Sequence, residues 1–461
     1  MDLGSTCILV ERRLSYNLLC GLLLFSHHET DVTDDPKPAH TTSARRGFSL
    51  PENLRSLRHR NFRLFLSGQL VSTAGTWMQS VAQSWLVYRL TGDSAMLGLV
   101  GFVGQIPSLL FAPLGGSLAD TRNRHQIVLV TQAASMVLAF MLAGLTLTGS
   151  IRIWHVFVLS GLLGLANAFE IPARQAFLYE MVGRDDLLNA IALNSSMFNG
   201  ARVVGPALAG IVIAAVGEGW CFFINGASFL AVLAGLLMMR LEPWKPGPPS
   251  GRSALGHMAE GFHFVATTAP VRALLLLLGL VSLTGLPFSV LMPIFADQIL
   301  HGGPKALGML MGASGFGALF GALVLTSRKG VTGLGRWVML GAGGFGLTLI
   351  AFSTSRAYWL SVALLIPAGF TVMLQFGATN TLIQSMIPDR LRGRVMAVYA
   401  MMIMGMSPFG ALFAGYLAKW IGPPGTVAVG GTACLCGALI FGLRLGSLRT
   451  EGRALIADQE R

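Results

Sequence analysis

Charged residues are scarce in this sequence. Asp, Glu, Lys and Arg make up 12% of its 461 residues, about half of the ~25% that is usual in soluble domains. A water-soluble fold of this length needs a charged surface, so the shortage excludes almost every soluble enzyme. It also argues against a disordered chain, because disordered segments are rich in charge and poor in apolar residues.

Cysteines are few, and catalytic motifs are missing. The chain has only five cysteines, scattered along its length, which excludes a disulfide scaffold. Cys434 and Cys436 lack the second ligand pair that a zinc site needs. The sequence contains no Gly-x-Ser-x-Gly, His-Glu-x-x-His or Walker motif. We therefore expect no enzyme activity, no metal, no cofactor and no use of ATP.

Apolar residues, by contrast, are abundant, at 53% of the chain, and glycine accounts for 57 residues. From Phe62 onward the chain reads as twelve apolar stretches, each long enough to cross ~30 Å of hydrocarbon as a helix. They are 62–89, 96–118, 126–148, 153–178, 188–216, 220–240, 272–295, 305–326, 334–353, 358–379, 394–418 and 425–445. The sequence therefore predicts an all-α polytopic membrane protein with twelve transmembrane helices.

The longest break between these stretches divides them into two groups of six. This break is rich in Pro and Gly, which is typical of a linker. A weak internal repeat supports the division, because Met181–Gly210 aligns without gaps on Met386–Gly415. The predicted parts are a mostly disordered cytoplasmic extension at 1–60, a six-helix bundle at 61–240, a cytoplasmic linker at 241–271, a second six-helix bundle at 272–446 and a cytoplasmic tail at 447–461.

The basic residues predict the orientation. Of the 33 Lys and Arg residues, 27 lie in or next to the tails and loops on one side of the twelve stretches, and 5 lie on the other side. Cytoplasmic loops carry such an excess, so both termini are predicted to be cytoplasmic. This asymmetry explains the net charge of +12 without any binding of nucleic acid.

The loop after the second stretch carries a recognisable motif. Residues 115–124 read Gly-Gly-Ser-Leu-Ala-Asp-Thr-Arg-Asn-Arg. The loop resembles the signature Gly-x-x-x-Asp-Arg-x-Gly-Arg-Arg of the major facilitator superfamily, with matches at Gly116, Asp120 and Arg124. The expected Arg and Gly are replaced by Thr121 and Asn123. The resemblance implies two six-helix halves arranged around a central cavity.

This loop is our candidate gate. We expect Gly116 to let two helices approach closely, and Asp120 to accept charge-assisted hydrogen bonds from basic groups such as Arg122 and Arg124. Such contacts can hold one conformation closed and break in another. The alternative is an ordinary positively charged turn with one acidic residue.

The fifth stretch contains a second resemblance. Residues 200–210 resemble the Gly-Pro-x-x-Gly-Gly element of proton-linked drug exporters in the same superfamily, through Gly205, Pro206 and Gly210, with Ala209 for one glycine. The resemblance implies an antiporter-type helix element and export. The alternative is ordinary packing by small residues, which is common in membrane helices.

A narrower resemblance covers about 58–445. Segments 61–63, 90–94 and 172–177 are similar to the branch that includes bacterial enterobactin exporters and macrolide-efflux-like permeases. This resemblance implies a multi-pass protein of the bacterial cytoplasmic membrane. It does not identify a substrate.

Polar residues inside the spans are candidates for the substrate cavity. Side chains three and four residues apart share one helix face, and lipid would penalise a polar face. In the superfamily, the first, fourth, seventh and tenth helices generally line the cavity. The candidate cavity residues are Gln69, Thr73, Thr76, Trp77, Gln83, Asn167, Asn199 and Gln375. For Trp77, simple packing is the alternative.

Two charged residues are candidates for proton coupling. Glu170 and Arg202 lie within predicted spans, where ionisable groups are costly and mark functional sites. Their heights allow them to form a pair. Burial would favour the protonated form of Glu170, and a neighbouring arginine would favour its charged form. The alternative is a permanent structural ion pair.

The leading hypothesis is a proton-coupled exporter of a hydrophobic or amphipathic small molecule, such as a siderophore, drug or secondary metabolite, that works by alternating access. Two alternatives stay open. One is a facilitator or importer of a lipid or metabolite with the same fold, and the other is a membrane receptor or scaffold that transports nothing. The expected partners are the lipid bilayer, the small-molecule substrate and protons, and we expect a monomer.

Overall fold

The computed structural model describes residues 52–241, 254–328 and 330–459, and these residues are almost entirely helical. The elements of the first half are η1 (Glu52–Arg58), α2 (Arg60–Thr91), α3 (Ser94–Thr121), α4 (Arg124–Leu147), α5 (Ile153–Val216) and α6 (Glu218–Leu237). Those that follow are α7 (Ala254–Thr267), α8 (Ala269–Leu280), η2 (Val281–Gly285), η3 (Leu286–Leu291), α9 (Met292–Ile294), η4 (Phe295–Ile299), α10 (Gly303–Thr326), α11 (Leu334–Thr354), α12 (Tyr358–Met386), α13 (Asp389–Ala400), η5 (Met401–Gly405), α14 (Met406–Leu443) and α15 (Leu445–Gln459).

Each of the twelve predicted stretches falls on helix. Within the described residues, nine continuous helical segments are long and apolar enough to cross a membrane. Two of them hold two spans each, because the backbone breaks at Gly183 (φ 71°) in α5 and at Gly422 (φ 76°) in α14. Glycine adopts this left-handed conformation without steric cost. The remaining predicted stretch lies on α2. Its polar residues lower its hydropathy, so α2 is not among the nine segments. The predicted all-α membrane fold is confirmed.

The segment around residues 52–58 differs from the prediction. We expected a mostly disordered extension over 1–60, but η1 is a 3-10 helix attached to α5. The Ser56 N–H and hydroxyl both donate to Asn189 Oδ1, at 2.9 and 2.6 Å, and Arg55 pairs with Asp186. These hydrogen bonds and this ion pair attach η1 to the end of the bundle. The rest of the predicted extension, and residues 242–253 of the predicted linker, lie outside the described residues.

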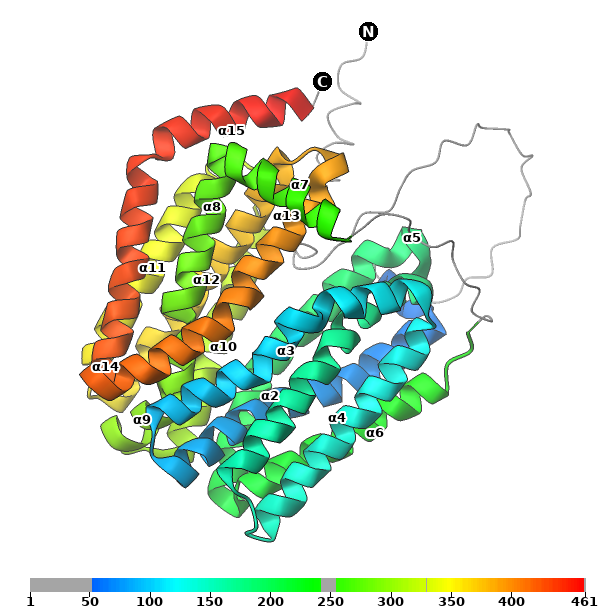
Figure 1. Ribbon diagram of the computed structural model, residues 1–461, viewed down its shortest axis with the longest axis vertical. Helices are drawn as coiled ribbons and strands as arrows, with labels where there is room; N and C mark the ends of the chain where they lie inside the picture. The colour runs from blue at the N-terminus through cyan, green and yellow to red at the C-terminus, as the bar shows by residue number, and fades with distance from the viewer. Residues whose placement is uncertain (1–51, 242–253, 329, 460–461) are drawn as a thin grey trace.

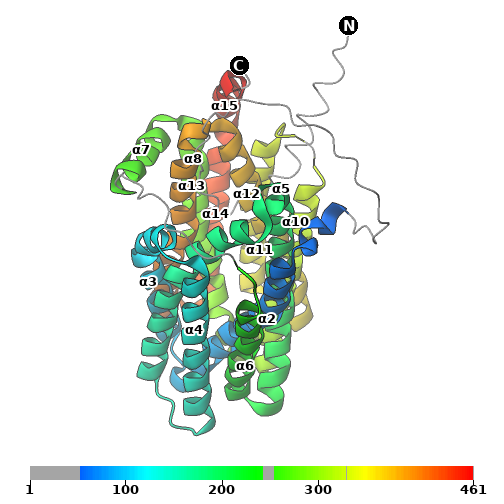
Figure 2. The same cartoon turned by 90° about the vertical axis from the view of Figure 1, so that its right-hand side faces the viewer.

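The helices form two groups. α2 to α6 pack against one another, and so do α8 to α14, while α5 packs on α10 and α3 packs on α14 between the groups. The described ends of the chain, η1 and α15, lie at the same end of the molecule (Figure 2), which we call the terminal end. The opposite end, which carries Asp93 and Lys419, is the far end. The ribbons of the two halves meet toward the far end and splay apart toward the terminal end (Figure 1).

Two glycine pairs bring the halves together near the far end. A Cβ on Gly210 would lie 3.0 Å from the Gly308 Cα, and a Cβ on Gly415 would lie 2.8 Å from the Gly98 Cα. Only small residues allow helix backbones to approach this closely. Gly210 and Gly415 also occupy equivalent positions in the weak sequence repeat. The repeat therefore corresponds to two similar helix crossings, one between α5 and α10 and the other between α3 and α14.

The first span of the second half is not a regular α-helix. It passes from α8 into the π-helix η2, the 3-10 helix η3, the short α9 and the π-helix η4. Pro287 and Pro293 lie within this region, and proline removes a backbone donor and disrupts an α-helix. Ser282 is fully buried in η2, and its hydroxyl has no hydrogen-bond partner among the described residues. Interrupted spans of this kind occur around transport sites in other membrane folds.

Candidate functional site

The polar faces of α2 and α5 are aligned with each other. Gln83 Nε2 on α2 donates to Ser160 Oγ on α5 at 2.9 Å. Because the two spans run in opposite directions with the same rise per residue, Thr76 lies at the height of Asn167. By the same count, Thr73 lies at the height of Glu170. The spacing of polar residues is thus matched along both helices.

The predicted cavity residues fall into two groups. Gln69, Thr73 and Gln375 are buried, with 2%, 7% and 0% of their surface exposed. They are packed between helices in this conformation, and their place in the substrate cavity stays a prediction. Neither amide atom of Gln375 has a hydrogen-bond partner within the described chain, and the Gln69 Nε2 also lacks one. Helix packing buries these amides despite the cost of leaving them unpaired.

The other candidate residues keep some exposed surface. Thr76 is exposed, whereas the others are partly buried: Trp77, Gln83, Asn167 and Asn199. The amide of Asn199 donates to the Ser195 carbonyl oxygen one turn earlier, at 2.9 Å. They belong to α2 and to both spans of α5. The accessible part of the predicted site therefore lies in the first half.

Glu170 and Arg202 do not form the pair that we considered. Glu170 Oε1 accepts a hydrogen bond from Gln132 Nε2 at 2.9 Å and lies 3.3 Å from Arg174 Nε. Arg174 is one helical turn away and reaches Glu170 along the same face. Arg202 lies on the second span of α5, with its guanidinium 5.8 Å from the centre of the Trp77 ring. The lateral packing of the two spans separates the charges that their heights could have joined.

The candidate gate differs in detail from the prediction. Arg124 Nη1 donates to Glu180 Oε1 at 2.8 Å, and Arg124 Nε donates to the Ala119 carbonyl oxygen. Asp120 and Arg122 are exposed, and neither forms an ion pair with any described residue. Glu180 was not predicted; the only signal for it was its position at the end of the fourth stretch, on the side of this loop.

The close helix approach in this loop involves a different glycine. A Cβ on Gly115 would lie 2.1 Å from the Ala168 carbonyl oxygen, whereas a Cβ on Gly116 would meet nothing within 4 Å. The predicted packing role of Gly116 is therefore wrong. Adjacent helical residues point about 100° apart, so only one glycine of the pair can face α5. Gly115 is the one that does.

The antiporter-type element lies at two helix contacts. A Cβ on Gly205 would lie 2.5 Å from the Trp77 Cβ of α2. The Pro206 carbonyl oxygen and Gly210 face Gly308 of α10 across the boundary between the halves. Gly200, in contrast, has open space beside it. The element thus joins α5 both to its own half and to the other half.

Polar contacts close the far end. Asp93 Oδ2 lies 2.8 Å from Lys419 Nζ, and the Tyr88 hydroxyl donates to Asp297 Oδ2 at 2.7 Å. Ser94 donates to the Gly415 carbonyl oxygen at 2.9 Å. We call these three contacts the far-end latch. They all join the two halves, whereas the terminal-end ion pairs Arg55–Asp186, Arg124–Glu180 and Arg394–Glu260 each stay within one half.

Sequence analysis missed this latch, although Lys419 is one of only five basic residues on the sparsely charged side. Asp93 caps the start of α3, where it also accepts a hydrogen bond from the Ala95 N–H. Burial of Asp93 opposes its ionisation, but the hydrogen bonds from Lys419 and Ala95 outweigh it and lower the pKa of this carboxyl below its ordinary value. The closed latch therefore favours the charged form of Asp93.

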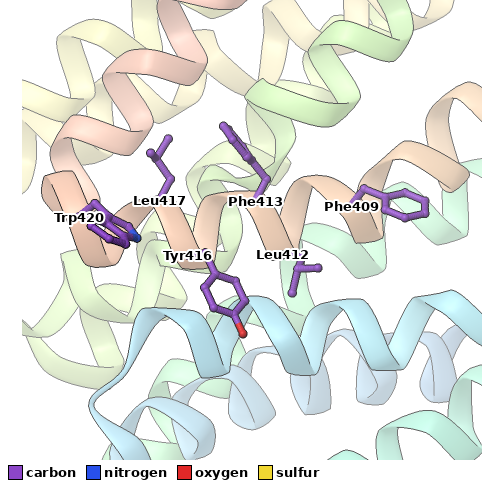
Figure 3. Close-up of a pocket in the computed structure, with 6 residues that line it drawn as sticks. All are labelled: Phe409, Leu412, Phe413, Tyr416, Leu417 and Trp420. Carbon is purple, nitrogen blue, oxygen red and sulfur yellow. The ribbon is translucent and has the colours of Figure 1, made fainter.

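An apolar groove lies on the outer face of α14 (Figure 3). Its lining residues are Phe409, Leu412, Phe413, Tyr416, Leu417 and Trp420. Trp420 is 85% exposed, near the far end. Aromatic side chains commonly sit where a membrane span meets the interface, so this groove is part of the lipid-facing surface. Within the described residues, no group of three or more His, Cys, Asp or Glu side chains could hold a metal ion.

Comparisons with known proteins agree on the kind of protein. The chain is 23% identical to the staphyloferrin A transporter of Staphylococcus aureus (82% of this chain, 94% of the relative). It is 29% identical to the multidrug efflux pump Tap of Mycolicibacterium fortuitum (78% and 89%). It is 25% identical to the enterobactin exporter EntS of Citrobacter koseri (85% and 93%).

Solved structures support the fold. A bacterial homologue of the human lysosomal transporter Spinster, in an inward-facing conformation, matches with a TM-score of 0.63 at 14% identity over 89% of this chain and 99% of that one. A POT family transporter matches with a TM-score of 0.68 at 11% identity over 84% and 96%. Residues 52–457 match the family described as transmembrane secretion effector. The chain therefore belongs to this family of membrane transporters of the major facilitator superfamily, and it is not an enzyme.

Proposed function

We propose that this protein exports a hydrophobic or amphipathic small molecule from the bacterial cytoplasm by alternating access, in exchange for protons. The observation that carries the proposal is the far-end latch, together with terminal-end ion pairs that each stay within one half: Arg55–Asp186, Arg124–Glu180 and Arg394–Glu260. The excess of Lys and Arg near the terminal end favours a cytoplasmic location for it and for both chain termini. This conformation would then load its substrate from the cytoplasm.

Glu170 is the proposed proton-responsive group. It is the one carboxylate that lies away from the ends of the predicted spans, and it is held by Arg174 and Gln132. Protonation of Glu170 would remove the charge that holds Arg174 and would weaken the contact between α4 and α5. The alternative stays a permanent ion pair that only stabilises the bundle. Arg202 contacts Trp77 instead, so its proposed role is separate from the Glu170 pair.

The loop between α3 and α4 is the proposed gate at the terminal end. Asp120 and Arg122 are exposed and unpaired among the described residues, while Arg124 is held by Glu180. When the far end opens, the terminal ends of the halves must approach each other. Asp120 and Arg122 would then be available for new charge-assisted hydrogen bonds across the boundary.

Two preparations test the proposal. An efflux panel of drugs and siderophores in a pump-deleted bacterium, with and without a protonophore, would identify an exported compound. The same compound would then be followed in proteoliposomes with an imposed pH gradient. We expect Glu170→Gln to remain folded and to lose gradient-driven transport, whereas the control Glu451→Gln, at an exposed position in α15, keeps it. Gradient-driven transport by Glu170→Gln would refute the role of this carboxylate.

The same assay separates the alternatives. Transport without dependence on a pH gradient would favour a facilitator, and movement in the opposite direction would favour an importer of a lipid or metabolite. No movement of any compound in the panel would favour a receptor or scaffold. We expect the purified protein to be a monomer, which light scattering in detergent would check.

A further inference from the structure

Two charged side chains lie well inside the predicted spans, Glu170 and Arg202, and Arg174 lies one turn from the end of its span. Glu170 and Arg174 form an ion pair with each other. Arg202 has no carboxylate within ion-pair distance among the described residues. The spans of the second half contain no Asp, Glu, Lys or Arg away from their ends. Arg202 therefore has no counterion in this conformation, and none can come from the interior of the other half.

The Arg202 side chain lies beside a pair of aromatic rings that contact each other. Its guanidinium is 5.8 Å from the centre of the Trp77 ring. The Trp77 ring in turn contacts Phe198 edge to face, with ring centres 5.6 Å apart at an angle of 66°. Phe198 is 43% exposed, and Arg202 and Trp77 are partly exposed. A cation–π contact stabilises the guanidinium, but it does not neutralise its charge.

Arg202 lies at the boundary between the halves. A Cβ on Gly315 of α10 would lie 2.8 Å from the Arg202 carbonyl oxygen, so the halves are still in contact at this height. Helical side chains point toward the N-terminus of their helix, and the second span of α5 begins at the terminal end. This tendency favours a guanidinium that points away from the closed far end, toward the splayed end of the halves.

We propose that Arg202, Trp77 and Phe198 bind an aromatic organic anion, so that the exported substrate is an amphipathic anion with an aromatic ring. This inference rests on the proposed transport function and adds the chemical class of its substrate. An uncompensated charge inside a membrane is costly, and the substrate would supply the missing counterion. The planar guanidinium matches a carboxylate with two parallel hydrogen bonds, while the two exposed rings offer edge-to-face contacts to an aromatic ring.

Two dyes of similar size test the charge preference directly. Fluorescein is an aromatic carboxylate, and ethidium is an aromatic cation. Their binding to the full-length protein in lipid nanodiscs is measured by fluorescence anisotropy, which requires no transport. We expect the wild-type protein to bind fluorescein more tightly than ethidium. Equal or tighter binding of ethidium would overturn the proposal.

Variants assign the preference to Arg202. Because a hydrogen bond to a charged group is lost, Arg202→Gln should weaken fluorescein binding by about tenfold or more, and should leave ethidium binding unchanged or stronger. Arg202→Lys keeps the charge and should retain part of the affinity, which also covers the case in which Arg202→Gln does not fold. The matched control Arg184→Gln removes an exposed arginine from the loop between the two spans and should change neither affinity. Unchanged fluorescein binding in both Arg202 variants would overturn the assignment.

The outcomes also separate this inference from the proposed function. If gradient-driven export is observed for ethidium and not for fluorescein, the exporter proposal stands and the anion site is refuted. If fluorescein binds through Arg202 but no compound is transported, the anion site stands and the exporter proposal fails.

Discussion

The strength of the far-end latch can be divided between its contacts. Asp93 and Lys419 have side chains that are 24% and 47% exposed. An ion pair this open to solvent contributes about 0.2–1 kcal/mol. The Tyr88 hydroxyl donates to the charged Asp297 over 2.7 Å and is part-buried, and a hydrogen bond to a charged group contributes about 1.5–3 kcal/mol. Tyr88→Phe should therefore weaken far-end closure more than Asp93→Asn.

Spin labels on opposite halves measure this difference. Leu90 and Ile421 are both exposed near the far end, so labels there would report its opening by double electron–electron resonance in a cysteine-free background. Asp93→Asn should raise the ratio of open to closed molecules about 1.4- to 5-fold, and Tyr88→Phe about tenfold or more. The charge swap Asp93→Lys with Lys419→Asp should restore closure. A larger effect of Asp93→Asn than of Tyr88→Phe would refute this division.

The latch also predicts a pH dependence. Burial opposes ionisation of Asp93, but the contacts with Lys419 and Ala95 give a net lowering of its pKa in the closed conformation. A carboxyl with a lowered pKa stabilises closure at pH above its ordinary value of about 3.9, and this contribution is lost as the pH falls through the lowered pKa. The latch itself should therefore contribute no change in the label distances from pH 8 to pH 5. A far end that opens between these values would exclude Asp93 as the responsible group.

Three further predictions concern packing. Gly115→Val should destabilise the protein by about 1–3 kcal/mol through overpacking, whereas the neighbouring Gly116→Val should have little effect, as measured by thermal unfolding in detergent. Gly210→Val should favour an open far end in the spin-label assay, with Gly200→Val as its unaffected control, because only Gly210 lies against the other half. Gln375→Leu should leave stability unchanged or raise it, because both amide atoms are buried without partners. If this variant keeps its stability but loses transport, Gln375 belongs to the substrate pathway.

The fold could be predicted from the sequence because lipid imposes one simple rule. Every span must be apolar and about 20 residues long, so hydropathy alone located all twelve helical segments. The break at Gly183 did not disturb this, since the polar residues around it already separated two stretches. The interrupted span from α8 to η4 was not predicted, because Pro287 and Pro293 did not reduce its hydropathy.

The site was harder to predict because it depends on the rotation of each helix about its axis. The height of a residue along the membrane follows from counting residues. By this count, Glu170 and Arg202 lie at heights that permit an ion pair. Which helix faces meet depends on packing between helices. In the structure Glu170 pairs with Arg174, and Arg202 lies over Trp77. Helix rotation also explains why Gly115, and not the predicted Gly116, makes the close helix contact. The sequence could therefore identify the charged residues but not their partners.

The two glycine crossings limit how the halves can move. Gly210 and Gly415 lie at equivalent places in the repeat, and each packs against a glycine near the start of a helix in the other half. Opening the far end must separate both crossings together, because they join the same two bodies. Only the crossing of α3 and α14 adds polar contacts, from Ser94 and from Asp93 to Lys419. The repeat thus supplies a symmetric packing surface, while the polar contacts that hold it closed, from Tyr88, Asp93 and Ser94, do not follow the repeat.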